Sequence, residues 1–124
     1  KEFKFNSIIT YDAIISAEQL NEDLLSNLEI LEPYGNGNNE PKFLIKDLNL
    51  NFINIIKDRH LSMTLNNKLG NSIKAISFNV VNTILGEHLL NSKNRTLDIL
   101  ATLKRNYFSN KNVIQVIVND AAYS

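Results

Sequence analysis

The sequence predicts a mainly β domain: a five-stranded barrel with a helix between the third and fourth strands, preceded by an extended segment and an amphipathic α-helix. Two observations predict this class. From residue 43 onward, five segments rich in β-branched and aromatic residues are separated by short polar turns, and residues 82–90 interrupt them with helical spacing. Before residue 41, leucines recur at helical spacing instead. The 124 residues suffice for one globular domain and an appendage.

The first forty residues predict an extended segment and then a helix. Residues 3–15 contain strand-forming residues with little helical spacing. Ser16, followed three residues later by Gln19, has the pattern of a capping box, and Asn21 is a second candidate N-cap. An acidic amphipathic helix is predicted from there to Pro33, with its leucines packed on the core. These leucines are Leu20, Leu24, Leu28 and Leu31.

The first two barrel strands are predicted at residues 43–57 and 60–66. The first is long, and we expect it to be bent or bulged around residues 49–51. The second alternates cleanly between apolar and polar residues, as a half-buried strand does. Leu61, Met63 and Leu65 fall on one face, and His60, Ser62 and Thr64 fall on the other.

The rest of the barrel follows after a turn that contains Gly70. Residues 73–78 form the predicted third strand, in which Lys74, Ile76 and Phe78 share a face, and we expect Phe78 to belong to the core. Residues 82–90 form the short helix, and residues 96–108 and 113–120 form the last two strands. Three strands, a helix and two strands are the order of an OB-fold barrel.

The charges divide the chain into two parts. Residues 1–40 carry two basic and eight acidic side chains, a balance of −6, whereas residues 41–124 carry eleven basic and five acidic ones, a balance of +6. A glycine-punctuated hinge, residues 31–41 (LEPYGNGNNEP), lies at the boundary. We therefore predict a strand, acidic helix and hinge over residues 1–40 and the barrel over residues 41–124. A basic β-rich module is typical of nucleic-acid binders.

Composition excludes several classes of site. The chain has no cysteine, which excludes disulfides and thiolate metal sites and favours a reducing, cytoplasmic location. No apolar run is long enough for a membrane span, and no signal peptide opens the chain. With His60 and His88 as its histidines, we expect no metal site and no cofactor in this chain. Because the first residue is Lys1, we expect a piece of a longer protein.

The hinge resembles the segment that opens the C-terminal OB-fold domain of RecJ, the single-stranded-DNA-specific 5′→3′ exonuclease of bacteria. Asn39 stands where that family usually has proline. Later stretches, residues 60–65, 75–79 and 106–120, are similar to the family in order and spacing, although Ser62 replaces a usual lysine. The matching hinge residues are Leu31, Glu32, Pro33, Tyr34, Gly35, Gly37, Asn38, Glu40, Pro41 and Phe43.

The resemblance implies a function in DNA repair and recombination. The family's hydrolase activity lies in a DHH phosphoesterase domain, which binds a divalent metal (magnesium or manganese) and which this chain lacks. The fragment is therefore expected to be a non-catalytic single-stranded-DNA-binding module. Its expected partners are single-stranded DNA and the remaining RecJ domains.

An OB barrel usually binds single strands across its second and third strands, flanked by the first–second and fourth–fifth loops. Phosphates attract cations, and unpaired bases stack on exposed aromatic rings. The predicted nucleic-acid-binding residues are Lys57, Arg59, His60, Lys68, Lys74, Lys104, Arg105, Asn106, Tyr107, Phe108 and Lys111.

Two other hypotheses compete with this one. A protein-docking or scaffolding module would brace the nuclease domains or recruit a partner such as single-strand-binding protein. An enzyme within these 124 residues would need a catalytic set, and the sequence contains no Ser/His/Asp or Cys/His set, phosphate loop or metal-binding carboxylate pair to support one.

Overall fold

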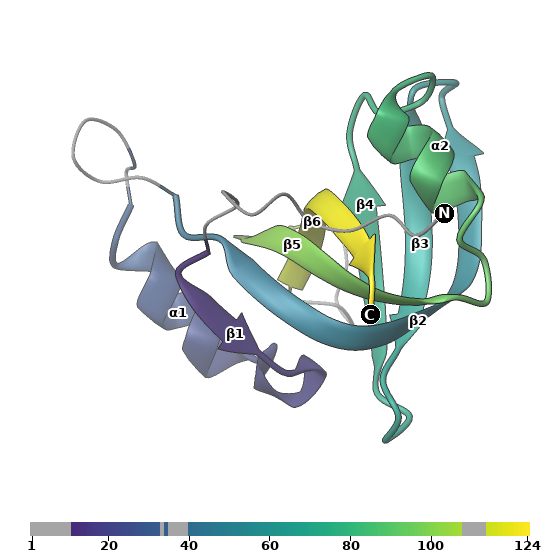
Figure 1. Ribbon diagram of the computed structural model, residues 1–124. Helices are drawn as coiled ribbons and strands as arrows, with labels where there is room; N and C mark the ends of the chain where they lie inside the picture. The colour runs from purple at the N-terminus through teal and green to yellow at the C-terminus, as the bar shows by residue number, and fades with distance from the viewer. Residues whose placement is uncertain (1–10, 33, 35–39, 108–113) are drawn as a thin grey trace.

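The computed structural model describes residues 11–32, 34, 40–107 and 114–124 (Figure 1). Within them the chain forms six strands, two α-helices and a short 3₁₀ helix, and the predicted mainly β class is confirmed. The strands are β1 (Ala13–Ile15), β2 (Phe43–Ile56), β3 (His60–Asn66), β4 (Ser72–Ser77), β5 (Thr96–Arg105) and β6 (Ile114–Tyr123). The helices are η1 (Ala17–Gln19), α1 (Glu22–Glu29) and α2 (Ile84–Leu90).

Five of the strands close into a barrel. Neighbouring strands follow the order β2-β3-β4-β6-β5, and β5 pairs back onto β2. All barrel pairs are antiparallel except β4 with β6, which pair in parallel through Ala75–Val116 and Ile76–Ile117. The helix α2 follows the third barrel strand, so the predicted OB-fold order is confirmed.

The long strand β2 closes the barrel because it bends. Its first half pairs with β5 and its second half with β3. The predicted irregularity is present as a register shift against β3 between Leu50 and Phe52. A second shift, against β5, lies between Ile45 and Leu48, where Asp47 has a φ of 58°. Such bulges increase the local twist of a strand and let it curve around a core.

Alternating side chains fill the barrel as the sequence predicts for β3. Leu61, Met63 and Leu65 are buried, and the residues between them face outward. In β4 the inward positions are Ile73, Ala75 and Ser77, and the Ser77 hydroxyl donates a hydrogen bond to the carbonyl of Val118. The expectation that Phe78 belongs to the core is wrong. It has the outward parity of Ile76, and 43% of it is exposed.

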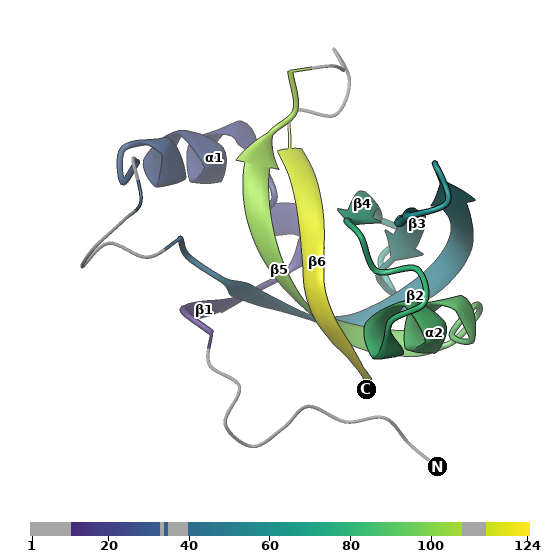
Figure 2. The same ribbon diagram turned by 90° about the horizontal axis from the view of Figure 1, so that it is seen from above.

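The N-terminal segment packs on the barrel beside β5 and β2. Within the described part of residues 3–15, Ala13–Ile15 form β1, which pairs in parallel with Phe43–Ile45 of β2. The helices α1 and α2 lie on opposite sides of the barrel (Figures 1 and 2). Since Leu25 and Leu28 of α1 join the same apolar cluster as the barrel residues, the acidic helix and the barrel share one core.

Both candidate caps of the acidic segment are used. The side chain of Gln19 accepts a hydrogen bond from the Ser16 N–H, which starts η1, and the side chain of Asn21 accepts one from Leu24, which starts α1. Because α1 ends at Glu29, Leu31 falls outside the helix and is 46% exposed. The buried leucines of α1 are therefore Leu25 and Leu28 rather than the whole predicted stripe.

Truncation of Leu25, the most deeply buried leucine of α1, tests whether α1 packs on the barrel. Leu25 is only 1% exposed, so Leu25→Ala should lower the free energy of unfolding by about 2–5 kcal/mol. The matched control Leu31→Ala, at an exposed position, should change it by less than about 0.5 kcal/mol. Urea unfolding followed by circular dichroism measures both values. Equal effects of the two variants would show that α1 does not pack on the barrel.

Candidate nucleic-acid interface

Three neighbouring strands present polar and aromatic side chains on the side away from the core. The strand registers place Phe52 of β2 opposite Thr64 of β3, and Thr64 opposite Lys74 of β4. The Nζ of Lys74 donates a hydrogen bond of 3.2 Å to the Thr64 hydroxyl. We call this surface the outer face; it consists of Phe52, Asn54, His60, Ser62, Thr64, Lys74, Ile76 and Phe78.

Two exposed aromatic rings lie on the outer face, and the sequence analysis proposed neither as a site residue. Phe52 is 51% exposed and Phe78 is 43% exposed. The bulge after Leu50 changes the parity of β2, so that Ile53 turns inward and Phe52 turns outward. The change from Leu48 and Leu50 at even positions to Ile53 at an odd position is the sequence signal for this reversal.

His60 is held in place at the end of the outer face. Its ring meets the ring of Phe78 edge to face, with 5.3 Å between the ring centroids. Its Nδ1 accepts a hydrogen bond of 2.9 Å from the backbone N–H of Asn79, which puts the ring proton of a neutral His60 on Nε2. His60 and Phe78 therefore form one fixed platform of two rings.

The tight turn between β2 and β3 brings two of the predicted cations to the same end. Lys57 and Asp58 both have positive φ, and the Arg59 N–H donates to the Ile56 carbonyl, which closes a tight turn of three residues between Ile56 and His60. Lys57 and Arg59 are exposed. The Arg59 carbonyl accepts hydrogen bonds from Val80 and Val81, which ties the turn to the segment before α2.

A groove of about 170 Å³ extends the outer face toward the β5–β6 connection. It brings Lys74 of β4 next to Asn106, which follows β5. Tyr107, the next residue, is 80% exposed. The predicted residues Phe108 and Lys111 lie outside the residues that the structure describes. The groove is lined by Ser62, Lys74, Ala75, Ile76, Asn106, Ile114 and Gln115.

Arg105 contacts the acidic helix instead of standing free on the surface. Its Nε and Nη2 donate to the two carboxylate oxygens of Glu29 at 3.0 and 2.6 Å, and its Nη1 and Nη2 donate to those of Glu22 at 3.1 and 2.7 Å. Such bidentate pairs are the strongest class of side-chain hydrogen bond. Arg105 therefore fastens β5 to α1.

Lys104, the preceding residue of β5, forms a single ion pair with another carboxylate of residues 1–40. Its Nζ lies 2.5 Å from Oε2 of Glu40 and 5.8 Å from the centre of the Tyr34 ring. The Tyr34 hydroxyl in turn donates to the carbonyl of Leu28 in α1. The structure thus separates Lys104 and Arg105 from the other predicted cations, because both neutralise carboxylates of residues 1–40.

These contacts shift the pKa values of the charged groups. The hydrogen bonds from Arg105 hold the pKa values of the Glu22 and Glu29 carboxyls below their usual value of 4.5. The same hydrogen bonds raise the pKa of Arg105. The hydrogen bond to Glu40 raises the pKa of Lys104. Each partner therefore favours the charged form of the other.

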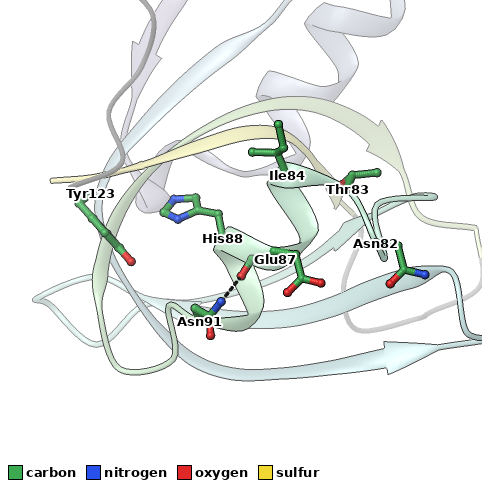
Figure 3. Close-up of a pocket in the computed structure, with 7 residues that line it drawn as sticks. All are labelled: Asn82, Thr83, Ile84, Glu87, His88, Asn91 and Tyr123. Atoms are coloured by element: carbon green, nitrogen blue, oxygen red, sulfur yellow. Dashed lines mark hydrogen bonds between the residues drawn. The ribbon is translucent and has the colours of Figure 1, made fainter. Parts of the chain in front are cut away.

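The remaining predicted cation, Lys68, is exposed in the turn between β3 and β4. It borders a polar pocket of about 310 Å³ near the bend of β2. A different pocket, of about 510 Å³, lies between one side of α2 and Tyr123 near the C-terminus (Figure 3). Burial lowers the pKa of His88 there, and its ring meets the ring of Tyr123. Since Glu87 is the charged residue among the described lining, this pocket does not suit a phosphate.

Two further findings concern the described residues. They contain no group of three or more His, Cys, Asp or Glu side chains arranged to hold a metal ion. In the same residues, no helix has the length and apolar character needed to cross a membrane.

The fold and the outer face together indicate the class of protein domain to which the chain belongs. A closed five-stranded barrel in this order, with exposed rings and cations along its first three strands, is an OB-fold domain, a fold that often binds nucleic acid. The family model of the RecJ OB domain matches residues 11–120, so the chain belongs to that family. This membership points to a nucleic-acid-binding module of RecJ-like proteins.

A search of curated proteins found no match. Among solved structures, the chain is similar to the aspartyl tRNA synthetase from Entamoeba histolytica, with 13% sequence identity and a TM-score of 0.49. The match covers 98% of this chain and 27% of that protein.

The Arg105 contacts predict a pH-dependent contribution to stability. A carboxyl whose folded pKa is lowered stabilises the fold fully above its unfolded pKa of about 4.5, and this contribution is lost as the pH falls through the folded value. The double variant Glu22→Gln/Glu29→Gln should therefore have a lower urea midpoint than the unmodified chain at pH 7, and the difference should shrink below about pH 4.5. Glu32→Gln is the control. A difference that persists unchanged to pH 3 would exclude the ion pairs as its cause.

Proposed function

We propose that this chain is the non-catalytic single-stranded-DNA-binding module of a RecJ-like 5′→3′ exonuclease that acts in DNA repair and recombination. One observation carries the proposal: Phe52 and the His60–Phe78 platform expose rings on a face that is bordered by cations. Exposed rings stack on unpaired bases of any sequence, and lysine and arginine neutralise phosphates. The cations are Lys74 within the outer face and Lys57, Arg59 and Lys68 at its edges.

The path of the strand follows from the positions of these groups. A strand that crosses β3 and β4 would meet Lys57 and Arg59 at one end of the face, with Lys74 in its middle. It would then enter the groove between Lys74 and Asn106, where Tyr107 offers another exposed ring. In the whole cytoplasmic enzyme, this path would lead a 5′ end toward the nuclease domain, to which catalysis and its magnesium or manganese would belong.

The bracing role proposed as an alternative is supported by a separate observation. Arg105 and Lys104 bind carboxylates of the acidic segment at 2.5 to 3.1 Å, on the side of the barrel away from β3 and β4. The two roles use different surfaces, so one domain can perform both. A bracing function would be abolished in Arg105 variants that still bind DNA.

Salt dependence tests the phosphate contacts. The chain should bind fluorescent oligo-dT of about sixteen nucleotides, and its affinity should fall steeply between about 50 and 200 mM salt in an anisotropy titration. Lys57→Gln/Arg59→Gln should weaken binding and reduce the slope of log K against log[salt] by about 0.7 for each phosphate that the variant no longer neutralises. Lys42→Gln, which removes a charge beside β1, should leave the slope unchanged. Affinity that ignores salt would contradict the proposal.

Truncating the rings tests the stacking. Phe52→Ala and Phe78→Ala should each weaken oligo-dT binding by about 1–3 kcal/mol, while the salt slope stays the same. Because both rings are exposed, stability should change little. Tyr11→Ala, which removes an exposed ring outside the outer face, is the control in the same anisotropy assay. If all three variants bound with the affinity of the unmodified chain, the outer face would not be the stacking surface.

A further inference from the structure

We infer that the polar pocket beside the outer face takes one nucleobase of the bound strand and prefers a base that carries an exocyclic amino group. The inference rests on the proposed function, because the base arrives as part of a strand on the outer face. The pocket has a volume of about 310 Å³. It is lined by Asp47, Asn49, Asn51, Asn66, Asn67, Lys68 and Thr96.

The pocket continues the surface on which Phe52 lies. Asn49 of β2 pairs with Asn66 of β3, and Phe52 pairs with Thr64 two residues earlier in β3. Two residues along a strand span about 7 Å. A base stacked on Phe52 therefore places its neighbour in the strand beside the pocket, and Lys68 at the rim can meet a phosphate.

Both irregularities of β2 occur at residues that line this pocket. Asn51 is the extra residue of one shift, because Leu50 pairs with Leu65 and Phe52 pairs with Thr64. Asp47 lies within the other shift and has a positive φ. Bulges often re-aim side chains at functional sites, and positive φ in a residue other than glycine is a local strain that surrounding contacts must maintain.

Those surrounding contacts are present for Asp47. Its backbone N–H donates to Oδ1 of Asp98 at 2.9 Å, and the Ser124 hydroxyl donates to the same oxygen at 2.6 Å. The contacts hold the backbone of Asp47 and leave its carboxylate facing solvent. Within the described residues, that carboxylate accepts no hydrogen bond.

The pocket is rich in unused acceptors. Oδ1 of Asn66 is buried and has no hydrogen-bond partner in the part of the chain that the structure describes. By contrast, the Oδ1 acceptor of Asn67 is occupied by the N–H groups of Leu69 and Asn71, and its amide nitrogen donates to Glu18. Buried polar groups are normally paired, so an open acceptor in a pocket indicates that something else donates to it.

The hydrogen-bond acceptors of the pocket determine which nucleobase it can bind. Carboxylates and amide oxygens accept hydrogen bonds from the amino groups of cytosine, adenine and guanine, whereas uracil and thymine present a carbonyl at the corresponding edge. A calcium ion would fit less well, because it usually takes several carboxylates and Asp47 is the one carboxylate among the described lining residues.

Two homopolymers test the preference. Oligo-dC and oligo-dU of about sixteen nucleotides differ at the pyrimidine edge and have the same phosphates. The unmodified chain should bind oligo-dC at least about fivefold more tightly in anisotropy titrations. Asp47→Asn should reduce this ratio to near one, and asparagine tolerates the positive φ. Asp58→Asn, the same change at a residue with the same φ in the β2–β3 turn, should leave the ratio unchanged.

The outcomes separate the two proposals. Equal binding of both oligonucleotides by the unmodified chain would overturn the base pocket and leave the proposed function standing. A dC preference that survives Asp47→Asn would also overturn the pocket. Failure to bind either oligonucleotide would overturn both proposals.

Discussion

The bend of β2 is the constraint on which the rest of the structure depends. One strand must pair with β5 along its first half and with β3 along its second half, because that double pairing closes the barrel. A flat strand cannot do this, and the two register shifts supply the curvature. The second of these shifts, after Leu50, reverses the parity that Leu48 and Leu50 set, which turns Phe52 outward and Ile53 toward the core. Closure of the core and exposure of an aromatic ring thus have one physical cause.

Local periodicity predicted most of the fold. The alternation in residues 60–66 determined β3, its inward residues and its outward residues, since a strand has a period of two. The same rule, applied to β4, placed Lys74, Ile76 and Phe78 on one face. It could not tell which face was inward, because the fully buried Ser77 is small and polar while the exposed Phe78 is large and apolar. The hydrogen bond from Ser77 to Val118, forty-one residues away, resolves this apparent contradiction.

The candidate site was less predictable because its charges are decided by distant partners. The sequence run that joined Lys104 and Arg105 to Asn106 and Tyr107 looked like one cluster. In the structure, Glu29 and Glu22 bind Arg105 from 76 and 83 residues away, so side chains adjacent in the sequence have different environments. Nothing in the local pattern distinguishes a cation that meets a carboxylate from one that meets solvent. The charge difference between residues 1–40 and 41–124 was nevertheless informative. Some of the acidic side chains of the first part form ion pairs with basic side chains of the second part.

The arrangement of the two helices limits where a nucleic acid can bind. The helix α1 and β1 cover the side of the barrel formed by β5 and the first half of β2, and α2 lies on the opposite side near the end of β6 (Figures 1 and 2). The acidic helix would also repel phosphates from the side that it covers, because Glu22, Asp23 and Glu29 lie on it. The contacts of Arg105 with α1 and of Lys104 with Glu40 neutralise those two cations. The cations that remain near β3 and β4 therefore make the outer face the side of the barrel that is more favourable for a phosphate backbone.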